Sequence, residues 1–347
     1  MTDKWRTEAK FGLGVPNGGD FADPILLTAL AQDAEAAGWD GFYLWDHVIR
    51  RQPWQPMVDP WVTLAAVAVA TERIIIGPMV TPLARRRVSV VARQSVTLDR
   101  LAGGRLRFGV GLGAPDDEFT RFGEDADPKR RAHILDESLD ALQLLWSGEA
   151  VSYRGQHVTI DDVEFCPTPV NGHIPIWVAG GWPGGAPFRR AARFDGVWPV
   201  AKAGGYLTVD EFTECVSMVR DLRDSDAPFD ACFIDRSPAG GDAATSDKIG
   251  RLVDGGMTWW IDSLDDPTIP FEHHLARVHA GPPPTASVAL SATTPRQFAG
   301  SSEMARQRCA ERNVSVIFRG RLSGSGVAFG VRRVECGVRR SGSRRRW

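Results

Sequence analysis

The chain has 347 residues, of which 43% are hydrophobic and 24% charged, and its net charge is −2, which is ordinary for a soluble globular enzyme. No apolar run approaches the roughly 18 residues of a membrane-spanning helix, and residues 1–10 lack the apolar core of a signal peptide. Five widely spaced cysteines without a CxxC pair argue against a disulfide framework or a structural zinc site. We therefore expect a cytoplasmic protein with no membrane segment and no metal.

The charge is distributed unevenly along the chain. Residues 284–347 hold 13 arginines, no lysine and three glutamates, a net charge of +10; because the whole chain carries −2, residues 1–283 carry −12. This contrast predicts a folded domain over residues 1–283 and an irregular, Arg/Gly/Ser-rich basic tail over residues 284–347. The simplest interpretation of the tail is disorder. A nucleic-acid arm is an alternative, but its stacking groups are few and we expect no nucleic-acid partner; an out-of-frame reading of GC-rich DNA is a third interpretation.

In chain order, short apolar segments alternate with segments of helical spacing. The first half predicts a strand at 11–15, a helix after the Asp23–Pro24 cap, a strand at 41–45, a helix after the Asp59–Pro60 cap, a strand at 74–82, a helix at 88–101 and a strand at 105–113. The ridge Leu26, Leu30, Ala34 and Ala37 is expected to face inward on the first helix.

The second half continues the alternation. It predicts a helix at 129–146, a small hairpin at 151–160, strands at 174–179, 195–200, 229–234 and 257–261, and helices carrying residues 188–192, 208–223, 247–253 and 273–280. About eight strands alternating with about eight helices predict an α/β fold, a (β/α)₈ TIM barrel in which the hairpin is an insertion.

Asp46 and His47 are the main catalytic candidates, because they follow the strand at 41–45. A histidine at the carboxyl end of a barrel strand points towards the shared pocket, and its charge changes near neutral pH. His47 is therefore a candidate proton donor or acceptor. The alternative is a structural histidine that hydrogen-bonds to Asp46.

Gly77, Pro78 and Met79 interrupt an otherwise continuous core strand. Proline removes a backbone donor from the sheet, which predicts a bulge that would buttress a flat ring in the barrel mouth. A plain strand end is the alternative. The arginines at 85–87 suit either an anionic cofactor tail or a solvated helix start.

Two groups of glycines follow other strands. Gly109, Gly111 and Gly113 are spaced too closely for a dinucleotide fingerprint, and they suit either a close approach to a ring or phosphate or a tight turn. Gly180 and Gly181 precede a helix, where free backbone N–H groups suit a phosphate; a plain loop is the alternative.

Taken together, these segments resemble the luciferase-like monooxygenase superfamily of flavin- or deazaflavin-dependent oxidoreductases. The resemblance runs from about residue 10 to residue 283. It rests on the order and spacing of the segments GFYLWDH (41–47), IGPMVTPLAR (76–85), TLDRLAGGR (97–105), GVGLG (109–113), IWVAGG (176–181) and FDGVW (194–198).

The resemblance implies a TIM barrel with a reduced flavin-type ring in its mouth, and His47, with Asp46, as the proton-exchanging group. Relatives hold a cis peptide in the bulge, often a non-prolyl one, and Pro78 makes a cis Gly77–Pro78 bond an alternative here. The implied cofactor-binding residues are Gly77, Pro78, Met79, Thr81, Gly111, Gly113, Gly180 and Gly181.

The implied cofactor is reduced FMN or coenzyme F420, with NAD(P)H as a candidate electron source. Ala114 stands where F420-dependent dehydrogenases of this group often carry an acidic residue, so both cofactors stay open. The expected function is an oxidoreductase that acts on a small organic substrate by hydride transfer or oxygen insertion, and a homodimer is compatible with it. The alternatives are a flavin-binding barrel without turnover and a flavin-free lyase or hydrolase barrel, which would need an acid–base pair that the sequence does not reveal.

Overall fold

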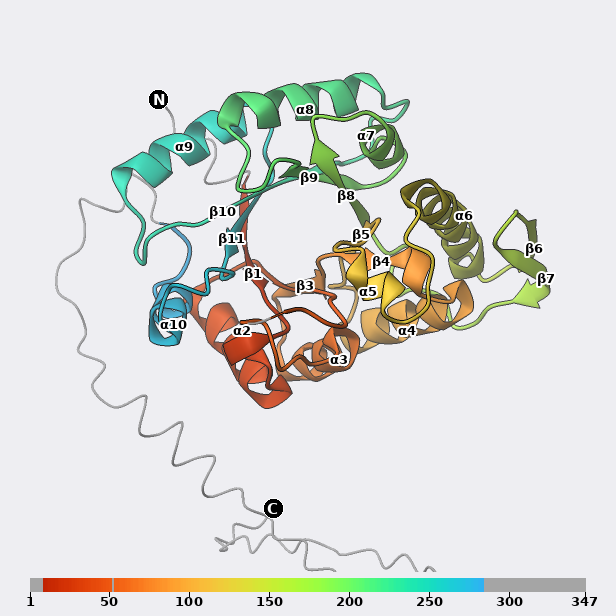
Figure 1. Ribbon diagram of the computed structural model, residues 1–347, viewed down its shortest axis with the longest axis horizontal. Coiled ribbons are helices and arrows are strands. Elements are labelled where there is room, and N and C mark those ends of the chain that lie inside the picture. The colour runs from red at the N-terminus through yellow and green to blue at the C-terminus, as the bar shows by residue number, and fades with distance from the viewer. Residues whose placement is uncertain (1–8, 52, 284–347) are drawn as a thin grey trace, which may run out of the picture. The chain divides into compact units, whose positions relative to one another are not determined.

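Alternating strands and helices wind into a parallel barrel in the computed structural model, which describes residues 9–51 and 53–283 (Figure 1). The predicted tail at 284–347 lies outside the described residues. The barrel strands are β1 (Lys10–Val15), β2 (Gly41–Leu44), β3 (Ile75–Pro78), β4 (Thr81–Pro82), β5 (Phe108–Gly111), β8 (Ile176–Trp182), β9 (Gly196–Ala201), β10 (Asp230–Asp235) and β11 (Trp259–Ser263).

The nine strands of the barrel sheet among the described residues occupy eight positions, because β4 continues β3 after the break at Met79. Neighbouring strands pair in parallel, and β11 pairs with β1. On the other side, Thr81 of β4 pairs with Val110 of β5, and Ile76 of β3 bridges to Leu106. The barrel is thus nearly closed, and the predicted TIM-barrel fold is confirmed.

Helices surround the ring of strands (Figure 1). They are α2 (Pro24–Ala37), α3 (Pro60–Ala70), α4 (Val88–Leu101), α6 (Pro128–Trp146), α7 (Ala186–Ala191), α8 (Val209–Asp221), α9 (Ala243–Asp254) and α10 (Phe271–His279), with the short turns η1 (Gly19–Phe21), η2 (Leu83–Arg85) and α5 (Asp117–Thr120) in loops. The antiparallel hairpin of β6 (Ala150–Arg154) and β7 (Thr159–Glu164) lies outside the barrel beyond α6, as an insertion should. Among the described residues, no helix combines the length and apolarity needed to cross a bilayer.

The predicted capping residues are found at the starts of three helices. Asp23 and Asp59 accept backbone N–H bonds at the first turns of α2 and α3, each followed by proline, and Thr208 with Glu211 forms the predicted capping box of α8. The predicted inward ridge of α2 was partly wrong. Its buried residues are Leu27, Leu30, Ala31 and Ala34, whereas Leu26 and Ala37 are only half-buried.

Aromatic side chains fill the barrel interior. The rings of Tyr43, Trp177 and Trp259 pack with centroids 5.3–5.8 Å apart, and all three side chains are buried. Trp177 and Trp259 come from the first two positions of β8 and β11, and the Tyr43 ring reaches back to Gly41 at the start of β2, where a Cβ would lie 2.6 Å from it. The interior is therefore packed from the amino ends of the strands, which leaves the carboxyl ends as the open mouth.

Candidate functional site

A cavity of about 690 Å³ opens at the carboxyl ends of the strands. Its wall is mostly apolar or glycine, with segments from β2, the β3–β4 break, β5, β8, α6 and α7. The lining includes Trp45, Asp46, His47, Met79, Val80, Pro82, Gly111, Leu112, Gly113, Ala114, Ala179, Gly180, Gly181 and Pro187. Its volume is in the range of small-molecule sites, roughly 300–1,000 Å³.

His47 meets a carboxylate that the sequence analysis did not single out. Its Nδ1 lies 2.6 Å from Oε1 of Glu118 in α5, and the Glu118 side chain is only 1% exposed. The bond to Glu118 engages Nδ1, and Nε2 makes no hydrogen bond to any residue that the structure describes. His47 thus lines the cavity with one ring nitrogen fixed and the other available. The alternative of a histidine bonded to Asp46 is wrong.

Arg85 holds Glu118 from its other side. Its Nη1 donates to Oε2 of Glu118 at 2.6 Å, and its Nη2 donates to the backbone oxygen of Asp46 at 2.9 Å. The Arg85 side chain is 7% exposed, so the ion pair is shielded from water. This bridge ties the loop after β5 to the loop after β2 and fixes the carboxylate that His47 faces.

Asp46 is the centre of a second buried group. Its carboxylate accepts from Thr81 Oγ1 at 2.7 Å, Trp61 Nε1 at 3.1 Å and Arg86 Nη2 at 2.7 and 2.9 Å. Arg85 and Arg86 therefore face inward as ion-pair partners, rather than towards solvent or a cofactor tail. These contacts favour Asp46 as a residue that positions the loop of His47, and a catalytic role for it stays a prediction.

The predicted break in the third barrel strand forms a projection at Met79 and Val80, which line the cavity. The cis peptide bond lies between Met79 and Val80, a non-prolyl bond, and Gly77–Pro78 is not among the cis bonds of the described residues. Gly77 is required by close packing, since an added Cβ would lie 1.9 Å from the carbonyl oxygen of Arg107.

Gly111 and Gly113 are needed for close packing and for a turn, respectively. A Cβ on Gly111 would lie 2.7 Å from a methyl of Val80, so glycine allows β5 to approach the projection. Gly113 has φ +88° and makes the turn that leads to Pro115 and α5. Gly111 and Gly113 line the cavity, and their contact with a cofactor stays a prediction.

Gly180 and Gly181, on the neighbouring strand β8, also line the wall. A Cβ on Gly180 would meet Pro187 at 2.3 Å, and one on Gly181 would meet Lys202 at 3.1 Å. Lys129 and Lys202 also line the cavity and bring positive charge to this side. The predicted phosphate contact is therefore compatible with the local charge.

Seven of the ten predicted site residues come together around this cavity: Asp46, His47, Met79, Gly111, Gly113, Gly180 and Gly181. Gly77, Pro78 and Thr81 do not line it. Within residues 9–51 and 53–283, no group of three or more His, Cys, Asp or Glu side chains is arranged to hold a metal ion.

Fold and site together define a parallel barrel with a cavity at its mouth and a histidine–carboxylate pair at the cavity's edge. The sequence profile of the luciferase-like monooxygenase family matches residues 14–206, more than half of the chain. The protein belongs to this family.

Two relatives illustrate the range of similarity. An uncharacterized protein of Mycobacterium tuberculosis is 29% identical over 259 residues, which cover 70% of this chain and 88% of the relative. An F420-dependent glucose-6-phosphate dehydrogenase of Microbacterium testaceum is 34% identical over 182 residues, which cover 50% of this chain and 49% of that enzyme. The match to the dehydrogenase thus spans only about half of either protein.

A solved structure supports the fold. The oxygenating constituent of 3,6-diketocamphane monooxygenase from Pseudomonas putida, a type II Baeyer–Villiger monooxygenase in complex with FMN, aligns with a TM-score of 0.64. The alignment covers 83% of this chain and 100% of that chain at 16% identity. At this identity the likeness shows the fold alone.

Proposed function

We propose that this protein is an oxidoreductase that couples hydride transfer with coenzyme F420 to proton transfer at a small organic substrate. The observation that carries the proposal is the His47–Glu118 pair at the edge of an apolar cavity in the barrel mouth. The F420-dependent dehydrogenase among the relatives supports F420 as the cofactor. FMN with oxygen insertion is the second candidate, supported by the fold shared with an FMN-bound monooxygenase.

The residues present fit a flat cofactor with an anionic tail. The cavity wall at Met79, Val80 and Leu112 is apolar, as a ring system requires. The positive charges of Lys129 and Lys202 stand at its α6 and β9 side, away from His47, where a phosphate would be neutralised. The apolar part of the cavity thus suits the cofactor's ring system, and the lysine side suits its anionic tail.

When bound, F420 supplies or accepts a hydride. The protein's own part is proton transfer: His47 Nε2 accepts a proton from a substrate hydroxyl in oxidation, or donates one to a carbonyl oxygen in reduction. Glu118 stabilises the imidazolium that forms, and it fixes the ring through Nδ1. Arg85 prevents the Glu118 carboxylate from turning away.

The other interpretations differ in measurable ways. A cofactor-binding barrel without turnover would bind F420 or FMN and convert no substrate. A flavin-free lyase or hydrolase would need an acid–base pair, and His47 and Glu118 form such a pair. Family membership and the apolar ring-sized wall now favour the oxidoreductase instead.

The decisive experiment is a fluorescence-monitored titration of the full chain with F420 and, separately, with FMN. The complex that forms is then mixed with a panel of alcohols and ketones, with NADPH as an alternative electron source, and cofactor reduction or oxidation is followed by absorbance. We expect F420 to bind and to turn over with at least one substrate. Binding of neither cofactor would refute the proposal.

A histidine variant separates catalysis from binding. His47→Gln should retain cofactor affinity and lose turnover by roughly 10²–10⁴-fold, the usual contribution of general acid–base catalysis. His133→Gln, on the exposed face of α6, is the matched control and should behave as the wild type. Equal turnover in the wild type and His47→Gln would remove His47 from the mechanism.

A further inference from the structure

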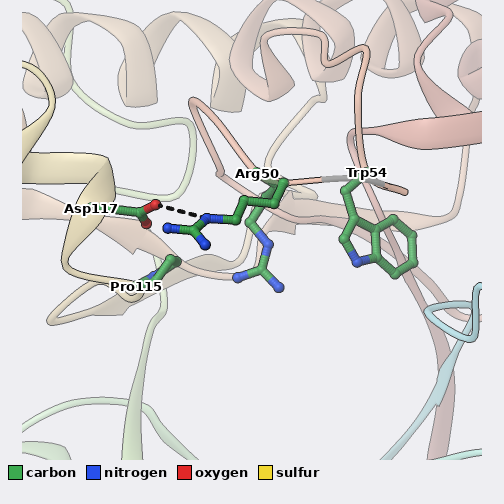
Figure 2. A pocket seen from close by; sticks show the side chains of 5 residues that line it. Arg50, Trp54, Pro115 and Asp117 are labelled. Carbon is green, nitrogen blue, oxygen red and sulfur yellow. Dashed lines mark ion pairs between the residues drawn. The ribbon is translucent and has the colours of Figure 1, made fainter.

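A second cavity lies beside the first, between the loop after β2 and the loop after β5 (Figure 2). Its volume is about 480 Å³, and Arg50, Arg51, Trp54, Pro115 and Asp117 line it. Figure 2 shows Asp117 and Pro115 on one side, Trp54 on the other, and Arg50 between them. The proposed proton transfer uses none of these side chains.

Within the part of the chain that the structure describes, this second cavity carries more positive than negative charge. Arg50 is half-buried and forms no ion pair or hydrogen bond with any residue in the described part of the chain. Arg51 reaches the Asp117 carboxylate only at 3.7 Å, and Arg121 shares that carboxylate at 3.4 Å. Arg51 and Arg121 thus share one carboxylate, while Arg50 has no carboxylate partner among the described residues. This excess of positive charge suits an anion.

The nearby Arg85 and Arg86 differ from Arg50 in their ion pairing. Both make short ion pairs with buried carboxylates, at 2.6 Å to Glu118 and 2.7 Å to Asp46. Arg85 and Arg86 are therefore paired, whereas Arg50 has no such partner in residues 9–51 and 53–283. A guanidinium held partly out of water without a counter-charge gains most from an incoming carboxylate or phosphate.

An aromatic wall connects this cavity to His47. The Trp54 and Trp45 rings lie 5.1 Å apart between centroids, and the Trp45 and His47 rings lie 5.3 Å apart. Trp45 lines the first cavity and Trp54 the second. Ala114 and Pro115, adjacent in the chain, likewise line one cavity each. A molecule anchored in the second cavity would therefore lie along apolar surface towards the proton-exchanging ring.

The position of the second cavity favours the substrate over the cofactor as the source of the anion. The predicted phosphate contacts, Gly180 and Gly181, lie on β8, which stands three positions around the barrel from β2. Lys129 and Lys202 already supply cations on that side of the first cavity. A molecule whose anionic group lies beside Arg50 would instead extend from the reacting centre towards the loop after β2.

We propose that the second cavity binds a carboxylate or phosphate group of the substrate, whose apolar body lies along Trp54 and Trp45 towards His47. This inference rests on the proposed oxidoreductase function, because it assigns the substrate class of the same site. The substrates are then alcohols or ketones that carry an anionic group at a distance from the carbon that reacts.

The test compares anionic and neutral probes of similar size. Isothermal titration of the full chain, with and without saturating cofactor, uses 3-phenylpropionate and phenyl phosphate against the neutral 3-phenylpropanamide. We expect at least one anion to bind about tenfold more tightly than the amide at low salt, which is the size of one charge-assisted contact. The anion that binds more tightly identifies the group as carboxylate or phosphate, and either result supports the proposal.

Two variants locate the effect. Arg50→Gln should abolish the preference for the anion, whereas Arg154→Gln, which removes the same charge from the outer β6–β7 hairpin, should keep it. No preference in the wild type, or a preference that survives Arg50→Gln, would overturn the proposal. If Arg50→Gln weakens F420 binding and leaves probe binding unchanged, the cavity holds the cofactor's anionic tail and the substrate assignment is wrong.

The outcome is independent of the cofactor titration. If neither F420 nor FMN binds, the proposed oxidoreductase function fails, but the cofactor-free protein still reports whether Arg50 selects an anion. If the cofactor binds and turns over while the anion preference is absent, only the assignment of the second cavity fails.

Discussion

His47 and Glu118, separated by 71 positions in the sequence, face one another with Nδ1 and Oε1 2.6 Å apart. The carboxylate is fixed on its other oxygen by Arg85, also at 2.6 Å. Because Glu118 is 1% exposed, it has little freedom to exchange this pairing for water. In the proposed mechanism, Glu118 is therefore a positioning residue that acts through His47.

Replacing this carboxylate by an amide tests that role. Glu118→Gln retains the size of the side chain but removes the charge that stabilises the imidazolium, and we expect kcat to fall about 100-fold. Cofactor affinity should stay unchanged, and Glu118→Asp should recover part of the rate. Stopped-flow turnover and cofactor titration measure the two quantities. Glu124→Gln, an exposed change in the same loop, is the control; unchanged kcat in Glu118→Gln would contradict the role.

The barrel and His47 were predictable because their signals are local. Alternating apolar strands, the Asp–Pro helix starts and a histidine directly after a strand all lie within short windows of sequence. Glu118 lacked such a signal, since Asp116, Asp117 and Glu118 stand together in an acidic loop. Which of these three carboxylates is buried depends on the turn of α5 and on the contact with Arg85, which is distant in sequence.

The position of Glu118 also differs from the expected one. The resemblance implies an acidic residue directly after the glycine-rich strand, where Ala114 stands, whereas the acid that meets His47 lies four residues later. Arg85 and Arg86 posed a similar problem, because a basic run before a helix suits solvent as well as an ion pair. Burial of their partners, which decides between the two, is a property of the assembled barrel.

Asp46 is predicted to matter for stability. Asp46→Asn removes the counter-charge of Arg86 and disturbs the bonds to Thr81 and Trp61. Breaking a buried ion pair from one side costs about 3–5 kcal/mol, so urea denaturation should show a loss of this size.

A double-variant cycle completes the test of Asp46. Arg86→Met in the Asp46→Asn background removes the uncompensated charge and should restore part of the lost stability. An Asp46→Asn protein that is as stable as the wild type but inactive would instead identify Asp46 as catalytic.

Gly77 should tolerate no side chain. The Cβ of Gly77→Ala would lie 1.9 Å from the backbone oxygen of Arg107, which belongs to the barrel and has no room to yield, so we expect a loss of about 1–3 kcal/mol or more. Gly250→Ala is the matched control, because its Cβ meets nothing within 4 Å in the interior of α9, and it should stabilise by about 0.5–1 kcal/mol. Thermal unfolding of both variants measures the contrast, and equal effects would contradict the packing argument.

The His173–Asp195 pair predicts a dependence of stability on pH. Nε2 of His173 lies 2.9 Å from both carboxylate oxygens of Asp195. The hydrogen bond to Asp195 raises the pKa of His173, and its charge adds to the effect, while burial and Arg107 oppose it. Because the folded pKa lies above the ordinary value of 6.5, the pair contributes its full stability below that value and loses it as the pH rises through the folded pKa.

His173→Gln should therefore destabilise the protein most in mildly acidic buffer. The difference in unfolding free energy from the wild type is expected to be largest near pH 5.5 and to shrink towards pH 8, values on the order of one unit below and above the ordinary pKa. Denaturant titrations across this range measure it, with His133→Gln, an exposed change on α6, as the control for the substitution itself. The bond from the Ile176 amide to Asp195 survives in the variant, so the effect reports the imidazolium alone. A difference that is constant with pH, or that grows towards pH 8, would show that His173 does not gain its proton through Asp195.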